Sequence, residues 1–118
     1  MKRIILVAGL LLYGATSAWA QSRPLNAGTV NSSATIATGN TFQTVLAANS
    51  KRQSVTIQNN NTNNDNCWLF IGSAAAAKGT SILLAPGGSY QRYSPYVPTD
   101  AIQATCATTN DTMYIDTN

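Results

Sequence analysis

The sequence predicts an all-β domain: a small antiparallel β-sandwich of about seven short strands, with a jelly-roll or immunoglobulin-like strand order. Three observations support this prediction. Thr, Val, Ile and Tyr recur in short runs, and these residue types fit a pleated, half-buried surface. Asn, Gly and Pro collect between the runs, where they favour turns. The chain also contains no Glu, a residue that long amphipathic helices rarely lack.

Residues 1–20 have the three parts of a bacterial secretory signal. Lys2 and Arg3 are basic, residues 4–13 are apolar, and residues 18–20 (Ala-Trp-Ala) provide a cleavage site with small residues. The apolar run is too short to cross about 30 Å of hydrocarbon. We therefore predict a signal-peptide helix that is removed on export to the periplasm, the cell surface or the medium. An uncleaved N-terminal anchor is the alternative.

Cleavage would leave 98 of the 118 residues, enough for one domain. The mature chain keeps five basic and four acidic residues, so its net charge is +1. Binding to nucleic acid or to anionic lipid needs clustered Lys and Arg, and in the mature chain only Lys51 and Arg52 are adjacent. We therefore expect no nucleic-acid partner, and no membrane partner after cleavage.

The mature chain divides into an arm and a single sandwich domain. Residues 21–33 lack periodicity and are expected to form a flexible N-terminal arm, whose first ten residues have an edge strand as the alternative. The sandwich is expected over residues 34–118, and residues 34–37 lead into its first turn. The expected strands are residues 41–46, 53–58, 67–71, 81–84, 89–93, 101–106 and 113–116.

Alternation predicts which side chains of these strands face inward. Residues 53–58 alternate most clearly, with Val55 and Ile57 inward. Residues 67–71 are apolar on both faces, as expected of a central strand. In residues 41–46, we expect one side of the strand to carry Phe42, Thr44 and Leu46 and the other side to carry Gln43 and Val45.

Two of the predicted turns look like hairpin connections. Residues 59–66 (NNNTNNDN) are almost all turn formers, and we expect them to form a hairpin loop. In residues 85–88 (APGG), Pro presets φ and Gly permits positive φ, so we expect a hairpin that continues into residues 89–93.

Cys67 and Cys106 are the only cysteines, and they lie at strand ends in a chain directed to an oxidising compartment. A bridge between them closes a loop of about 40 residues, which the chain-entropy relation values at about 3–4 kcal/mol. We predict a structural disulfide that holds the two sheets face to face. Buried free thiols and an intermolecular bridge are the alternatives.

The residue types predict no catalysis, no metal site and no cofactor. The chain has no His, which removes the usual activating base of Ser and Cys nucleophiles and the commonest zinc ligand. A pair of catalytic carboxylates remains conceivable only because four Asp are present. Their positions fit turns and the chain end, so a hydrolase with an unusual site is the weakest reading.

Aromatic side chains are the candidates for a binding face, because Tyr and Trp bury a large area at low entropic cost. For Trp68 and Phe70 a core position is the stronger reading, because one of the two is expected to point inward from an apolar strand. For Tyr93 and Tyr96 the polar surroundings in residues 89–100 leave exposure and a core position equally open. The candidate binding face is Tyr90, Tyr93, Tyr96 and Trp68.

Four segments taken in order resemble a group of small phage and prophage structural proteins, the head-decoration or virion-associated β-domains. The order is a strand before a loop with Arg, an "IQN" strand, a short "G" strand, an "APGGS" hairpin, and a "P-T-x-A" connection before a final strand. The segments are residues 38–49, 51–60, 83–90 and 97–104. The resemblance implies a compact β-sandwich that packs against copies of itself or a host lattice without catalysis.

An export signal and a disulfide are unusual for a component assembled in the cytoplasm. These two departures from the family pattern suggest an exported bacterial or prophage-derived relative. We therefore expect a secreted structural or interaction protein that self-assembles or binds a particle or a cell surface. A carbohydrate-binding module that uses the Tyr and Trp face is the alternative. A secreted inhibitor that presents residues 59–66 to an enzyme is a further one.

Overall fold

A computed structural model describes residues 29–118, so the predicted signal peptide and residues 21–28 of the predicted arm lie outside the described part. The described chain is all-β, as predicted, with one short 3₁₀ turn, η1 (Lys78–Thr80). Its strands are β1 (Val30–Asn31), β2 (Ala34–Thr35), β3 (Gln43–Leu46), β4 (Ser54–Asn59), β5 (Cys67–Ile71), β6 (Ile82–Leu84), β7 (Ser89–Tyr93), β8 (Ile102–Cys106) and β9 (Thr112–Thr117).

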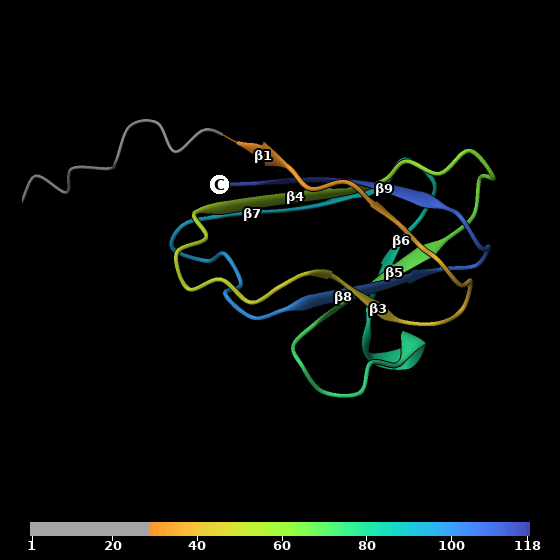
Figure 1. Cartoon of the computed structure of the whole chain (residues 1–118), viewed down its shortest axis with the longest axis horizontal. Coiled ribbons are helices and arrows are strands. Elements are labelled where there is room, and N and C mark those ends of the chain that lie inside the picture. Colours follow the sequence, from red (N-terminus) through yellow and green to blue (C-terminus); the bar gives the residue numbers. More distant parts are fainter. Residues whose placement is uncertain (1–28) are drawn as a thin grey trace, which may run out of the picture.

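The strands form two antiparallel sheets packed as a sandwich (Figure 1). Sheet A has the order β1-β9-β4-β7, with β2 also paired to β9, and sheet B has the order β3-β8-β5-β6. The pairing is nested: β1 and β2 pair with β9, β3 with β8, β4 with β7, and β5 with β6. One long hairpin rolled across two sheets has this pattern, so the fold is a jelly roll and not an immunoglobulin-like sandwich.

Each of the seven predicted strand segments contains a strand. The predicted arm, however, ends earlier than residue 33. Val30 and Asn31 pair with Thr117 and Asp116, and the Ser32 N–H donates to the Ile115 carbonyl at 2.8 Å. The backbone groups of this segment are therefore satisfied by sheet A.

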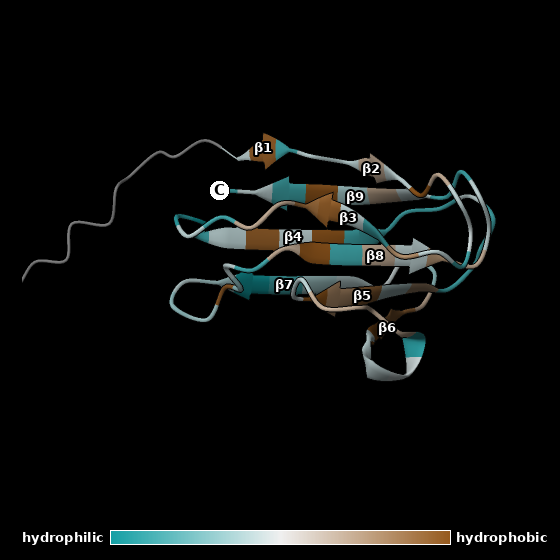
Figure 2. Ribbon diagram, turned by 60° about the horizontal axis from the view of Figure 1, so that its bottom comes forward, coloured by the Kyte–Doolittle hydropathy of each residue, from teal (hydrophilic) through white to brown (hydrophobic). Residues whose placement is uncertain are grey.

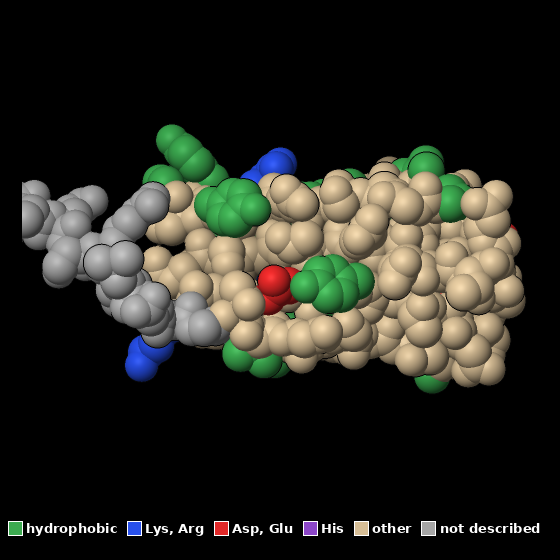
Figure 3. All heavy atoms as spheres, turned by 90° about the horizontal axis from the view of Figure 1, so that it is seen from above, with side chains coloured by type: hydrophobic (Ala, Val, Ile, Leu, Met, Phe, Trp, Pro, Cys, Tyr) green, Lys and Arg blue, Asp and Glu red, His purple; other side chains and the backbone are tan. Residues whose placement is uncertain are grey.

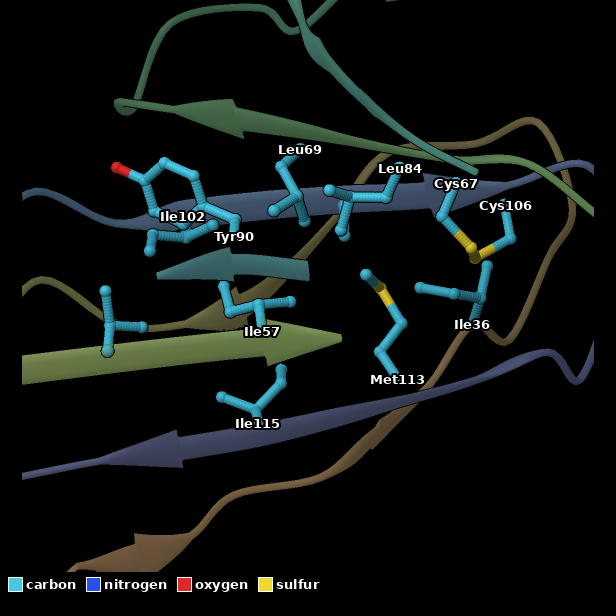
Figure 4. Close-up of a cluster of buried hydrophobic side chains, with 12 residues drawn as sticks. Ile36, Ile57, Cys67, Leu69, Leu84, Tyr90, Ile102, Cys106, Met113 and Ile115 are labelled. Atoms are coloured by element: carbon cyan, nitrogen blue, oxygen red, sulfur yellow. A yellow bond between two sulfur atoms is a disulfide. The ribbon is translucent and has the colours of Figure 1, made fainter. Parts of the chain in front are cut away.

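The core lies between the sheets and follows the predicted alternation on most strands. Figure 4 shows side chains from both sheets pointing into this space. Val55 and Ile57 of β4 are fully buried, as predicted. The remaining buried apolar residues are Ile36, Cys67, Leu69, Leu84, Tyr90, Ile102, Ala104, Cys106, Met113 and Ile115. Figure 2 shows the corresponding alternation of hydrophobic and hydrophilic residues along β4 and β8.

Strand β3 departs from the predicted alternation. Its register with β8 shifts between Thr44 and Leu46, which is the mark of a β-bulge. The bulge lets Val45 and Leu46 both pack against the core, although we expected them on opposite sides.

Neither predicted hairpin forms. Residues 60–66 connect β4 of sheet A to β5 of sheet B, and residues 85–88 connect β6 of sheet B to β7 of sheet A. The second turn has the predicted chemistry: Gly87 has φ +74°, and the Gly88 N–H donates to the Ala85 carbonyl at 2.8 Å. Turn residues determine where the chain reverses, whereas the nested pairing determines which strands become neighbours.

The disulfide forms as predicted, but it does not join the two sheets. Cys67 and Cys106 lie opposite each other on β5 and β8, which are neighbours in sheet B. Both side chains are fully buried on the inner face, at one end of the core (Figure 4). The bridge therefore fastens two interior strands of one sheet and makes no covalent link between the sheets.

Candidate functional site

Most of the large exposed apolar side chains lie on or just after two edge strands that follow each other in the chain. Strands β6 and β7 are edge strands of the two sheets, and the four-residue turn 85–88 places them on the same side. In residues 29–118 six large apolar side chains are exposed, and four of them lie on these strands or just after them. We name this group the β6–β7 side: Ile82 (40% exposed), Leu83 (54%), Tyr93 (61%) and Tyr96 (82%).

Tyr90 does not belong to this surface, contrary to the sequence-based prediction. It pairs with the inward residue Ile57, and its side chain is only 8% exposed (Figure 4). The Arg92 guanidinium lies 4.9 Å from the centroid of its ring, at the rim of the core. Alternation from Tyr90 to Tyr93 already placed the two rings on opposite faces of the strand, and this signal was available in the sequence.

Tyr93 and Tyr96 are brought together by a tight turn. The Tyr96 N–H donates to the Tyr93 carbonyl at 2.9 Å, and the Ser94 N–H donates to the Gln53 carbonyl at 2.8 Å. The turn is thereby fixed to the residue just before β4, while its two aromatic side chains stay exposed. This pair is the part of the predicted binding face that the structure brings together.

Arg52 supports the connection that follows this turn, and sequence reasoning missed it. The side chain is only 4% exposed, and its guanidinium donates to the carbonyl oxygens of Ala47, Pro98 and Asp100. Burial lowers the pKa of Arg52 from its usual value, and the negative charge of Asp100 partly opposes this shift. A buried cation with three carbonyl partners acts as a clamp between residues 47–52 and residues 97–100.

Trp68 lies on the other layer, away from Tyr93. It alternates with the inward residues Cys67 and Leu69, so it projects from the outer face of sheet B and is half-buried. Phe70 shares that face and is also half-buried, so the prediction that one of the two points inward is wrong. The candidate face of Tyr90, Tyr93, Tyr96 and Trp68 is therefore not a single surface.

The ring of Trp68 is covered by the segment between β5 and β6. The Lys78 ammonium lies 3.9 Å from the centroid of the ring and donates to the Asn40 side-chain oxygen. The Gln103 amide donates at 2.9 Å to the carbonyls of Gly72 and Ala74, which anchors the start of this segment. Trp68 is thus engaged within the chain.

The Asn-rich connection, residues 60–66, is held by its own side chains together with those of Asn59, Thr108 and Asp111. Asn59 is 1% exposed, and its amide donates to the carbonyls of Asp65 at 2.7 Å and Leu84 at 3.0 Å. The Asp65 carboxylate accepts from the Thr108 hydroxyl, and the Asp111 carboxylate accepts from Asn63 at 2.6 Å. The two carboxylates therefore order the turns at this end of the sandwich.

The outer face of sheet A is mostly polar. Figure 3 looks onto it from above and shows apolar side chains standing apart, with few charges. In residues 29–118, no three His, Cys, Asp or Glu side chains gather where they would hold a metal ion. No helix within that range is long and apolar enough to cross a membrane.

Comparisons with known proteins leave the site to be judged on its geometry. No protein-family model, no curated protein and no solved structure matches this chain.

Proposed function

We propose that this chain is an exported, non-catalytic structural protein that self-associates through the β6–β7 side. One observation carries the proposal: four of the six exposed large apolar side chains in residues 29–118 lie on or just after two edge strands that are consecutive in the chain. Exposed apolar groups along the edges of a sandwich favour a protein interface, because association removes them from water.

Two further features support this role. The buried Cys67–Cys106 disulfide suits an oxidising compartment and gives the domain a rigid scaffold. The predicted mature chain has a net charge of only +1, so copies of it repel one another weakly. The ordered strand motifs that resemble phage decoration proteins point to the same kind of assembly.

The test is the oligomeric state of the exported chain by analytical ultracentrifugation over a wide concentration range. We expect the wild type to self-associate, and Leu83→Ser and Tyr96→Ser each to weaken association by about tenfold or more, as interface anchors do. Val30→Ser is the matched control, because Val30 is 59% exposed but lies on β1, at the opposite edge of sheet A. A strictly monomeric wild type, or an equal effect of Val30→Ser, would contradict the proposal.

Carbohydrate binding is the second candidate, and the Tyr93–Tyr96 turn favours it. These are the two most exposed aromatic side chains among residues 29–118, and a backbone hydrogen bond fixes their separation. Stacking of sugar rings on exposed aromatic faces is a common mode of recognition. Binding to a glycan array that Tyr93→Ala and Tyr96→Ala abolish, and that Tyr114→Ala preserves, would favour this candidate over self-association.

A further inference from the structure

The four sheet edges differ in how readily another strand can add to them. Strand β6 has only three residues, β1 and β2 have two each, and β3 contains a register shift. Strand β7 is the exception, with five residues that pair with β4 without interruption. A long, regular edge is the usual place for unwanted strand addition, so β7 is the edge that most needs protection.

The backbone groups that β7 offers to a further strand can be assigned from its pairing with β4. The Ser94 N–H bonds to the Gln53 carbonyl, and the Asn59 N–H bonds to the Gly88 carbonyl. Antiparallel hydrogen-bonded pairs recur at every second residue, so Tyr90 and Arg92 direct their backbone groups toward β4. The free edge is formed by the backbone N–H and C=O groups of Ser89, Gln91 and Tyr93.

Two of these three outward carbonyls are already occupied by the chain itself. The Arg92 Nη1 donates to the Gln91 carbonyl at 2.9 Å, and the Tyr96 N–H takes the Tyr93 carbonyl at 2.9 Å. The Arg92 guanidinium also lies over the Tyr90 ring, which holds it beside the edge. The Gln91 carbonyl, the central outward acceptor of β7, is therefore occupied by the Arg92 side chain, which can move away.

We propose that Arg92 guards β7 against strand addition by a second copy of this chain. The occupant it excludes is the β7 strand of that copy, antiparallel about a two-fold axis at Gln91. This register pairs Ser89 with Tyr93 and Gln91 with Gln91 through the backbone groups that point away from β4, and the Tyr93 carbonyl uses its second lone pair because the Tyr96 N–H already takes the first. It places Arg92 opposite the partner's Tyr90, with no like charges opposed. The pairing extends sheet A across two molecules, and it does not rest on the proposed function, which uses exposed side chains.

The test compares Arg92→Ala with Lys51→Ala in the exported chain. Both changes remove one positive charge from an exposed position, but Lys51 lies in the loop before β4, away from the edge. By sedimentation velocity we expect Arg92→Ala to dimerise about tenfold more tightly than the wild type, and Lys51→Ala to match the wild type. Equal sedimentation of all three proteins would overturn the proposal.

A second variant identifies the mode of pairing. Gln91→Pro removes an N–H that points away from β4, so it blocks the free edge without deleting a bond of sheet A. Added to Arg92→Ala, it should return the dimer to the wild-type level. Persistence of the dimer would refute edge pairing.

Hydrogen exchange and Leu83→Ser separate this proposal from the proposed function. In the Arg92→Ala dimer, the Gln91 amide should exchange about tenfold more slowly than in the wild type, and an unchanged rate would count against the proposal. Added to Arg92→Ala, Leu83→Ser should leave the strand pairing intact. Added to the wild type, the same change should dissociate the assemblies that form through exposed side chains. Loss of the pairing with Leu83→Ser would assign it to the side-chain surface instead.

Discussion

Cys67 and Cys106 face each other across β5 and β8, with their Cα atoms 4.0 Å apart and both side chains fully buried. The residues between them in the chain, 39 positions apart, include β6 and β7 and thus the whole exposed apolar side. The bridge therefore closes a loop that crosses from sheet B to sheet A and back. Its main effect is to restrict the unfolded chain.

The double variant Cys67→Ala/Cys106→Ala should lower the free energy of unfolding by about 3–4 kcal/mol, because it releases this loop in the unfolded state. Urea denaturation measures the loss. In native protein both sulfurs should resist alkylation after mild reductant, because neither side chain is exposed. A loss below about 1 kcal/mol would show that the loop is already restricted without the bridge.

Arg52→Met should lower the free energy of unfolding by about 2–3 kcal/mol, because three carbonyl groups lose a charged donor in a buried place. Its neighbour Lys51 is exposed, so Lys51→Met should change stability by less than about 0.5 kcal/mol. Thermal denaturation of the two variants side by side is the measurement. Equal stability of both would contradict the clamp.

Asn59→Ala should cost about 1–3 kcal/mol, because it leaves the carbonyls of Asp65 and Leu84 without their buried donor. Asn60→Ala is the matched control: Asn60 is exposed, and only its backbone carbonyl accepts a hydrogen bond, from Thr112. Chemical denaturation should separate the two variants. A neutral Asn59→Ala would mean that water replaces the amide.

Gly39→Ala should destabilise the fold by about 1–3 kcal/mol, the usual cost of overpacking. A Cβ at this position would meet the Ala107 carbonyl oxygen at 2.8 Å and the Thr109 nitrogen at 2.9 Å, both of them backbone atoms that cannot rotate away. Gly79→Ala, where a Cβ meets nothing within 4 Å, should be neutral. If calorimetry gives the two variants the same melting temperature, the close approach at Gly39 is relieved by backbone movement.

Lys78→Gln should increase quenching of Trp68 fluorescence by acrylamide, because it removes the ammonium group that lies over the ring. With the leader cleaved, Trp68 is the only tryptophan, so the signal has a single source. Stability should fall by no more than about 1 kcal/mol. Lys51→Gln should leave quenching unchanged, and an equal rise in both variants would exclude a specific contact.

Much of the fold was predictable because it is local. Alternation placed Val55 and Ile57 correctly, and the Pro-Gly-Gly turn occurs where its residues predict. The pairing partners were not predictable in this way. Residues 85–88 look like a hairpin turn, yet β6 and β7 pair with β5 and β4 in different sheets, because burial of both apolar faces governs the arrangement.

The site was predicted only in part, for related reasons. Tyr93 and Tyr96 are exposed, which their polar surroundings had left open, whereas Tyr90 has the same surroundings but the opposite parity to Tyr93 on β7. Arg52 was missed because its partners are three backbone carbonyls from two loops. Every residue has a backbone carbonyl, so residue types in the sequence do not indicate which carbonyls will accept from a side chain. Where function depends on backbone groups, side-chain identities carry little information.

The position of β9 also governs when this chain can fold. β9 is the last strand in the sequence, yet it lies inside sheet A, where β1 and β2 pair with one side of it and β4 with the other. A ribosome-bound chain that ends before Thr112 lacks β9, so β1 and β2 have no strand with which to pair. It also lacks Met113 and Ile115, two residues of the core. The native pairing of the N-terminal strands therefore depends on a strand about 80 residues further along the chain, so these strands reach their final positions only once β9 is present.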